Sequence, residues 1–198
     1  MFPAEFESDR LRFVRLTRET LDPAELYETF GRNADVEKVY EYVDRSPYRT
    51  VKEAADAIDR SVERFDTGTA AQYAIRPRHG EDGAGQLAGI TGIYPKWDRR
   101  IATLGIVLDE PFWGRGYAGE RAATFLELAF EDLDLEIVAV KYIDGNTKSK
   151  RAIESYVERF GGQYEGLVRN DLHAEGSIYD CHRYSISRAA YDAAPGRV

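Results

Sequence analysis

The feature that most constrains the fold of this chain is the segment 107–120, in which an apolar strand pattern leads through a glycine-containing loop into a helix pattern. Gly114 and Gly116 lie in that loop. Such a loop presents several backbone N–H groups at a helix N-terminus, where a phosphate binds favourably. Glycine suits it because a side chain would hold the anion away from those groups. The segment therefore predicts a strand–loop–helix unit that binds a phosphate or pyrophosphate.

Two known phosphate loops have similar glycine spacing. Residues 114–119 fit the G-x-G-x-x-G pattern of dinucleotide-binding domains. That motif places its first glycine directly at the strand end, whereas Pro111 and four other residues come before Gly114 here. The P-loop pattern fails at its end, because Glu120 and Arg121 replace its lysine and its hydroxyl residue. A third pattern accounts for the segment better.

That third pattern rests on three further segments that follow in order. They are residues 8–16, residues 146–151, which open a second helix, and residues 176–186. With the loop they resemble the GNAT (Gcn5-related) N-acetyltransferase superfamily, and within it the ribosomal-protein N-acetyltransferase branch. There the loop reads tryptophan-glycine-basic-glycine-tyrosine-alanine, as residues 113–118 do; the wider superfamily has glutamine or arginine in place of the tryptophan. The resemblance runs nearly end to end.

The periodicity of the chain predicts an α/β (α+β) fold, a mixed and mostly antiparallel sheet flanked by helices. Helix starts are expected at Asp22, which precedes a proline, and at Thr50, which opens a capping box. Strand patterns cover residues 6–16, 70–76, 86–95, 100–108, 136–142, 163–173 and 178–187, and a helix pattern covers 116–133. A dinucleotide-binding domain would instead alternate strand and helix from the start.

Size and composition predict one domain, residues 1–198, as a monomer or homodimer. The chain is 43% hydrophobic and 31% charged, as expected of a globular protein. We expect a cytoplasmic protein, since there is no signal peptide, no membrane-spanning run and one cysteine, Cys181. Cys181 is interpreted as a core residue.

The formal net charge of −8 makes general nucleic-acid binding an unfavourable interpretation. The scattered acidic residues indicate a solubilising surface, and an attraction for a cationic amine stays open as the alternative. We expect no nucleic-acid partner and no membrane partner.

The resemblance implies that acetyl-CoA is the co-substrate. Backbone groups of residues 107–109 would hold its pantetheine arm, and N–H groups of residues 115–118 its pyrophosphate. Lysines in the first turn of the next helix are locally unfavourable, so they indicate a nearby anion or a solvated basic face. The predicted cofactor-binding residues are Val107, Leu108, Asp109, Trp113, Gly114, Arg115, Gly116, Tyr117, Ala118, Asn146, Ser149 and Lys150.

The catalytic residues follow less directly. Ser149 aligns with a serine that some relatives use near the cofactor sulfur. The attacking amine must be neutral, whereas an alkyl amine is mostly protonated at neutral pH. A residue must therefore accept that proton, and Asp171 and His173 are the predicted acceptors, with Glu110 and Glu41 as further candidates. No convincing nucleophile and no metal site is expected.

The sequence thus predicts an N-acetyltransferase that moves acetyl from acetyl-CoA to a primary amine by direct attack. The acceptor is a protein N-terminus or a small-molecule amine. Two alternatives stay open: a non-catalytic acyl-CoA sensor, and a dinucleotide-binding oxidoreductase that uses the glycine loop.

Overall fold

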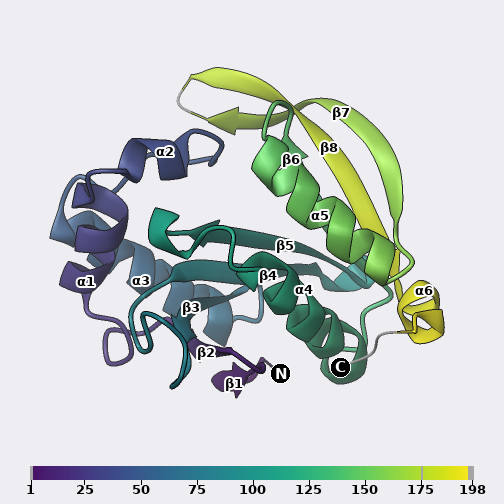
Figure 1. Cartoon of the computed structure of the whole chain (residues 1–198), viewed down its shortest axis with the longest axis horizontal. Helices are drawn as coiled ribbons and strands as arrows, with labels where there is room; N and C mark the ends of the chain where they lie inside the picture. Colours follow the sequence, from purple (N-terminus) through teal and green to yellow (C-terminus); the bar gives the residue numbers. More distant parts are fainter. Residues whose placement is uncertain (1, 175, 196–198) are drawn as a thin grey trace. The chain divides into compact units, whose positions relative to one another are not determined.

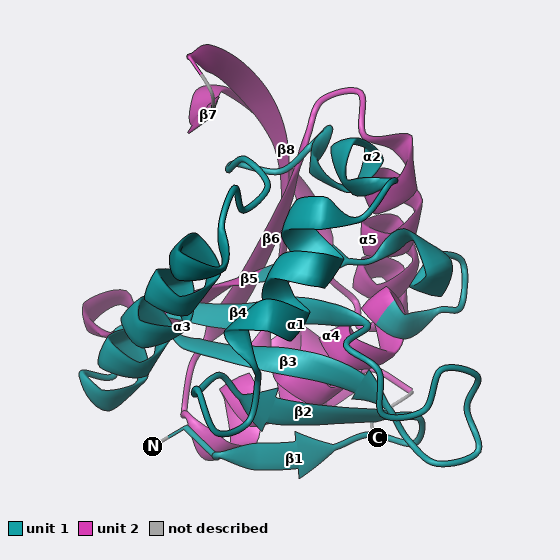
Figure 2. Ribbon diagram, turned by 90° about the vertical axis from the view of Figure 1, so that its left-hand side faces the viewer, with its two compact units in different colours: residues 1–94, 105–117 teal, residues 95–104, 118–198 magenta. Residues whose placement is uncertain are grey.

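The computed structural model of the chain describes residues 2–174 and 176–195. The chain divides into two compact units, which are residues 1–94 with 105–117 (unit 1) and residues 95–104 with 118–198 (unit 2) (Figure 2). Two strands, β4 and β5, and the helix α4 pass from one unit into the other. That residues 1–198 form one domain stays a prediction.

Unit 1 contains an antiparallel meander (Figure 1). Its strands pair in the order β1 Glu5–Glu7, β2 Leu11–Arg15, β3 Ala71–Pro77 and β4 Gly89–Lys96. Phe13 lies opposite Ile75, and Ala74 opposite Ile90. The strand predicted over residues 6–16 is two strands, because the Ser8 N–H donates to the Leu11 carbonyl (2.8 Å) and turns the chain.

The α-helices described in unit 1 are α1 Pro23–Tyr27, α2 Val36–Tyr40 and α3 Val51–Asp66, and a π-helical turn, Glu28–Arg32, follows α1. Both predicted helix starts are confirmed. The Asp22 carboxylate accepts the Ala24 N–H (2.8 Å), and the Thr50 hydroxyl accepts the Glu53 N–H (3.2 Å). The apolar faces of the helices pack on β3 and β4 in one buried cluster, which includes Leu26, Phe30, Val39, Tyr40, Ala54, Ile58, Ala74 and Ile90.

In unit 2 the first part of β5 Ile101–Leu108 runs parallel to β6 Ile137–Ile143. Next come the antiparallel strands β8 Ser177–Ser187 and β7 Gln163–Ala174, with Leu167 opposite His182. The helices are α4 Tyr117–Glu127, α5 Thr147–Arg159 and α6 Arg188–Ala193. Glu175, which lies between the strand patterns predicted over residues 163–173 and 178–187, is outside the described residues.

The predicted fold class is confirmed, because one parallel pairing stands among antiparallel ones. Cys181 is 1% exposed, and burial raises the pKa of its thiol to about 11, as suits a core residue rather than a nucleophile. No helix among the described residues has the length and apolar character needed to span a membrane.

Candidate active site

Among the residues that the structure describes, the C-terminal part of β5 has a ladder partner on one edge only. Its ladder with β6 ends at the pair Thr103 and Ala139, although both strands continue. The Asp109 N–H donates to the carbonyl of the residue before β4 (2.9 Å), so it faces the β4 edge. Since backbone groups of successive strand residues face opposite edges, those of Ile106 and Leu108 face the other edge. We therefore add the backbone of Ile106 to the candidate site. Its orientation follows from the strand pairing and could not be inferred from the sequence.

A short 3₁₀ turn, Glu110–Phe112, connects β5 to the glycine loop. Beyond it the Trp113 indole Nε1–H donates to the Leu108 carbonyl (2.8 Å) and so fixes the loop on the strand end. Before it the Asp109 carboxylate accepts the Glu110 N–H (3.0 Å) and an Asn33 Nδ2–H (2.9 Å). These contacts position the loop.

Asp109→Asn is expected to change how stability depends on pH. Burial raises the pKa of the Asp109 carboxyl above its ordinary value of 3.8. The folded state therefore holds this proton more tightly, and the native protein loses stability as pH rises through the raised pKa. Asparagine keeps the acceptor oxygen but has no charge. The stability of the variant relative to wild type, from denaturant unfolding, should rise as the pH increases above the ordinary carboxyl pKa of 3.8. A difference that is independent of pH would contradict this account.

Both glycines of the loop have left-handed backbone conformations, with φ of +74° at Gly114 and +79° at Gly116. A Cβ on Gly114 would meet no atom within 4 Å, so the space above it is open. Among the described residues, the N–H groups of residues 114–117 form no hydrogen bond. Open space and several unsatisfied donors before α4 fit a pyrophosphate.

Two arginines support the loop from outside. Arg10 Nη1 donates to the Arg115 carbonyl (3.0 Å), and its guanidinium lies 5.1 Å from the Tyr117 ring centre. The Arg115 guanidinium donates to the Asp82 carbonyl and carboxylate (both 2.9 Å). The Tyr117 hydroxyl donates to Glu81 (3.0 Å). Sequence reasoning missed Arg10, because its contact joins residues 105 positions apart.

The start of α5 holds the other predicted cofactor residues. Asn146 is the helix cap, as expected, since its Oδ1 accepts the Ser149 N–H (3.0 Å). Lys150 Nζ lies 4.0 Å from Glu154, which balances part of the basic first turn. Tyr156 further along is 5% exposed, and burial raises its pKa to about 12, which supports a packing role.

The predicted proton acceptors lie on β7. Asp171 Oδ2 accepts Lys141 Nζ–H (2.8 Å), and His173 is exposed opposite Ile178. Within the described part of the chain no hydrogen bond joins Ser149, Asp171 and His173 to one another. Their catalytic roles stay predictions.

A hydrogen-bonded chain through His182 fixes the turn before α5. His182 Nε2 lies 3.1 Å from Asp144 Oδ1, and its Nδ1 lies 2.9 Å from the Tyr164 hydroxyl. The ring stacks on Tyr142, with 4.8 Å between ring centres. This geometry indicates a structural role for His182, since all three partners belong to neighbouring segments of unit 2.

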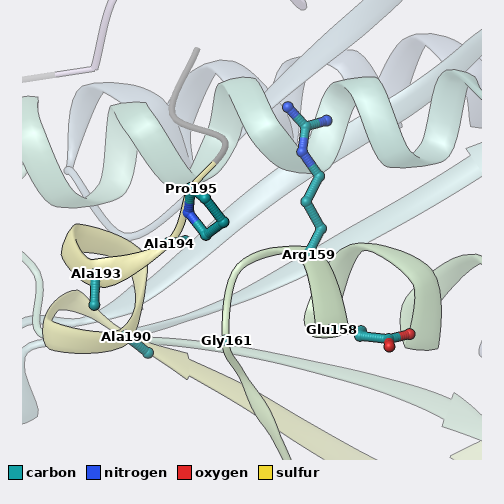
Figure 3. A pocket seen from close by; sticks show the side chains of 7 residues that line it. All are labelled: Glu158, Arg159, Gly161, Ala190, Ala193, Ala194 and Pro195. Carbon is teal, nitrogen blue, oxygen red and sulfur yellow. The ribbon is translucent and has the colours of Figure 1, made fainter.

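A surface hollow in unit 2 lies at the C-terminal end of α5, the end opposite Asn146. Figure 3 shows the residues that line it. Along the axis of this helix the two ends are about 20 Å apart. The hollow is lined by Glu158, Arg159, Gly161, Ala190, Ala193, Ala194 and Pro195. It has none of the predicted site residues.

Comparison with known proteins identifies related sequences and folds. The family model described as "Acetyltransferase (GNAT) domain" matches residues 10–156. The uncharacterized N-acetyltransferase p20 of Bacillus licheniformis is 25% identical over 178 residues, 90% of this chain and 94% of that protein. YdaF of Bacillus subtilis (strain 168), named as a candidate ribosomal N-acetyltransferase, is 32% identical over 93 residues, 47% of this chain and 49% of that protein. The crystal structure of the Microcin C7 self immunity acetyltransferase MccE, in complex with acetyl-CoA and AMP, has a TM-score of 0.76 at 17% identity, covering 94% of this chain and 97% of that one.

Proposed function

Because the chain belongs to the acetyltransferase (GNAT) family and is thus an acetyl-CoA-dependent N-acetyltransferase, we propose that its acceptor is a primary amine that attacks acetyl-CoA directly. The observation that carries the acetyl-CoA part of the proposal is the loop at residues 114–117, where unsatisfied N–H groups face open space above Gly114. Such a donor set suits the pyrophosphate of coenzyme A. The bound acetyl-CoA in the MccE structure supports the same assignment by fold likeness.

In this proposal the chain holds acetyl-CoA mainly through its backbone. The β5 edge at Ile106 and Leu108 would pair with the amide groups of the pantetheine arm, next to Val107 and Asp109. The N–H groups of residues 115–118 would hold the pyrophosphate, aided by the dipole of α4. Asn146 and Lys150 would contribute at the start of α5.

The reaction joins the amine nitrogen to the acetyl carbon and breaks the carbon–sulfur bond. The amine loses one proton, and the departing thiolate gains one. We assign the proton donor to the Ser149 hydroxyl and the proton acceptor to Asp171 or His173. Replacing any of the three side chains should lower kcat, and replacing Asp171 or His173 should leave the Kd of acetyl-CoA unchanged.

The acceptor is a protein N-terminal amine or a small-molecule amine. Partial likeness to YdaF supports a ribosomal protein as one candidate. Calorimetry with acetyl-CoA and NAD, followed by thiol release across a panel of peptides and small amines, tests the proposal. Acetyl-CoA binding with turnover of at least one amine is expected. Binding of NAD alone, or acetyl-CoA binding with no turnover of any amine, would overturn it.

Glu41→Gln combined with Asp44→Asn is expected to raise the KM for a cationic amine about threefold to tenfold. Both carboxylates are exposed on the segment that follows α2 and would attract the ammonium group. The Kd of acetyl-CoA should stay unchanged. The control changes the net charge equally with Glu19→Gln and Glu63→Gln, two exposed positions elsewhere in unit 1. Equal KM values in both double variants would show that the segment after α2 does not contribute to the acceptor site.

A further inference from the structure

An arginine that forms no ion pair with any described residue lies among tyrosines in unit 1. The half-buried Arg45 guanidinium is 5.6 Å from the ring centre of Tyr48, and the Tyr40 and Tyr94 side chains lie near enough to influence its charge. Asp44 also acts on it electrostatically, yet Arg45 forms no ion pair within the described residues. A partly desolvated cation without a paired anion is unfavourable. We call Arg45, Tyr40, Tyr48 and Tyr94 the Arg45 cluster.

The second observation is the Tyr40 hydroxyl. Tyr40 is 7% exposed, and among the described residues its hydroxyl makes no hydrogen bond of normal geometry, although the Arg45 side chain acts on it. A buried hydroxyl left in this state destabilises the protein. The Tyr94 hydroxyl accepts a Gln72 Nε2–H (3.1 Å), so its own O–H can still donate. The cluster therefore offers donors and a positive charge.

The Arg45 cluster lies beside the end of β5. Tyr40 belongs to the buried cluster of unit 1, against which Tyr48, Val107 and Trp113 also pack. The Tyr94 ring lies against β5, since a Cβ on Gly105 would be 3.4 Å from Tyr94 Cε2. The cluster thus shares its packing with the strand end assigned to the pantetheine arm.

We propose that the Arg45 cluster binds an anionic group of the acceptor, so that the acceptor is an amine that also carries a carboxylate or phosphate. This inference rests on the proposed function. The planar guanidinium would take the anion through two N–H groups, and the Tyr40 and Tyr94 hydroxyls would add donors. The exposed carboxylates of Glu41 and Asp44 would suit the ammonium end of the same molecule.

The test compares amines that differ only in charge: β-alanine against β-alaninamide, and the peptide amide Ser-Glu-Ala against Ser-Gln-Ala, with phosphoethanolamine as the phosphate arm. Wild type should prefer the anionic member of a pair about 10- to 100-fold in kcat/KM, which corresponds to one charge-assisted contact. Preference for the carboxylates or for phosphoethanolamine distinguishes the two anions. Arg45→Met should abolish the preference, and Tyr40→Phe, which keeps the ring, should lower it severalfold. Both variants should bind acetyl-CoA like wild type.

Turnover of charged and neutral amines with equal kcat/KM would overturn this inference and leave the proposed function standing. If no amine is turned over, the proposed function fails, and direct binding of β-alanine, measured by NMR titration, decides the inference. Binding that weakens at least tenfold in Arg45→Met or severalfold in Tyr40→Phe supports the cluster. Binding that is absent or equal in all three proteins refutes it.

Discussion

Gly116→Val is expected to weaken acetyl-CoA binding about 100-fold or more, since two or more charge-assisted backbone contacts would be lost. Gly116 has a φ of +79°, which a β-branched residue adopts only with strain, and a side chain there would approach Arg10 Nη2. Calorimetric titration of the folded variant measures the loss. Arg115→Ala should cost less than about threefold, because its guanidinium is bound to Asp82 and the proposed donors are main-chain groups.

Gly68→Val is the matched control for Gly116→Val. Gly68 has a φ of +69°, and a Cβ there would meet no atom within 4 Å. It therefore carries similar backbone strain at the turn after α3, away from the loop. Gly68→Val should lose stability but keep its affinity for acetyl-CoA. If Gly116→Val binds acetyl-CoA as Gly68→Val does, the pyrophosphate does not lie at this loop.

Gly89→Ala is expected to lower both the stability of the protein and its affinity for acetyl-CoA. The added Cβ would lie 2.6 Å from the Val107 carbonyl oxygen and 2.7 Å from Leu108 Cδ2, so the end of β5 must shift. Overpacking of this kind costs about 1–3 kcal/mol. The shift would also displace the backbone proposed to bind the pantetheine arm, and we expect an affinity loss of about tenfold or more, or about 1.4 kcal/mol. Denaturant unfolding and calorimetry measure the two effects.

Gly105→Ala provides the comparison, since it adds the same methyl group to β5 itself. Its Cβ would approach only the Tyr94 ring, at 3.4 Å, and no backbone atom. Stability and acetyl-CoA affinity should stay close to wild type. Equal affinity in Gly89→Ala and Gly105→Ala would show that the end of β5 does not contact acetyl-CoA.

Local patterns predicted most of the fold. Asp22 and Thr50 were recognisable as caps because a cap acts within its own few residues. The helix predicted over residues 116–133 exists as α4 followed by a π-helical turn, Leu128–Asp132. Alternation could not reveal the break between β1 and β2, since polar residues continue the pattern through the turn. The short helices α2 and α6 span five and six residues, too few for a clear period.

The candidate site was predictable where the chemistry lies in one continuous segment. Gly114 and Gly116 predicted a loop of backbone N–H donors, and both have the left-handed conformation that favours glycine. Ile106 and Arg10 were missed, because the first depends on strand pairing and the second on a contact across unit 1. The sequence pattern does not single out Arg45, because its tyrosine surroundings depend on how the folded chain places residues that are far apart in sequence.

The most direct test of the backbone-bound acetyl-CoA site is a ¹H–¹⁵N NMR titration of the assigned wild-type protein with acetyl-CoA. The account predicts that the largest amide shift changes fall on residues 114–118 and on residues 106–109 at the end of β5. Saturating shifts that leave both segments unchanged and fall elsewhere would contradict it.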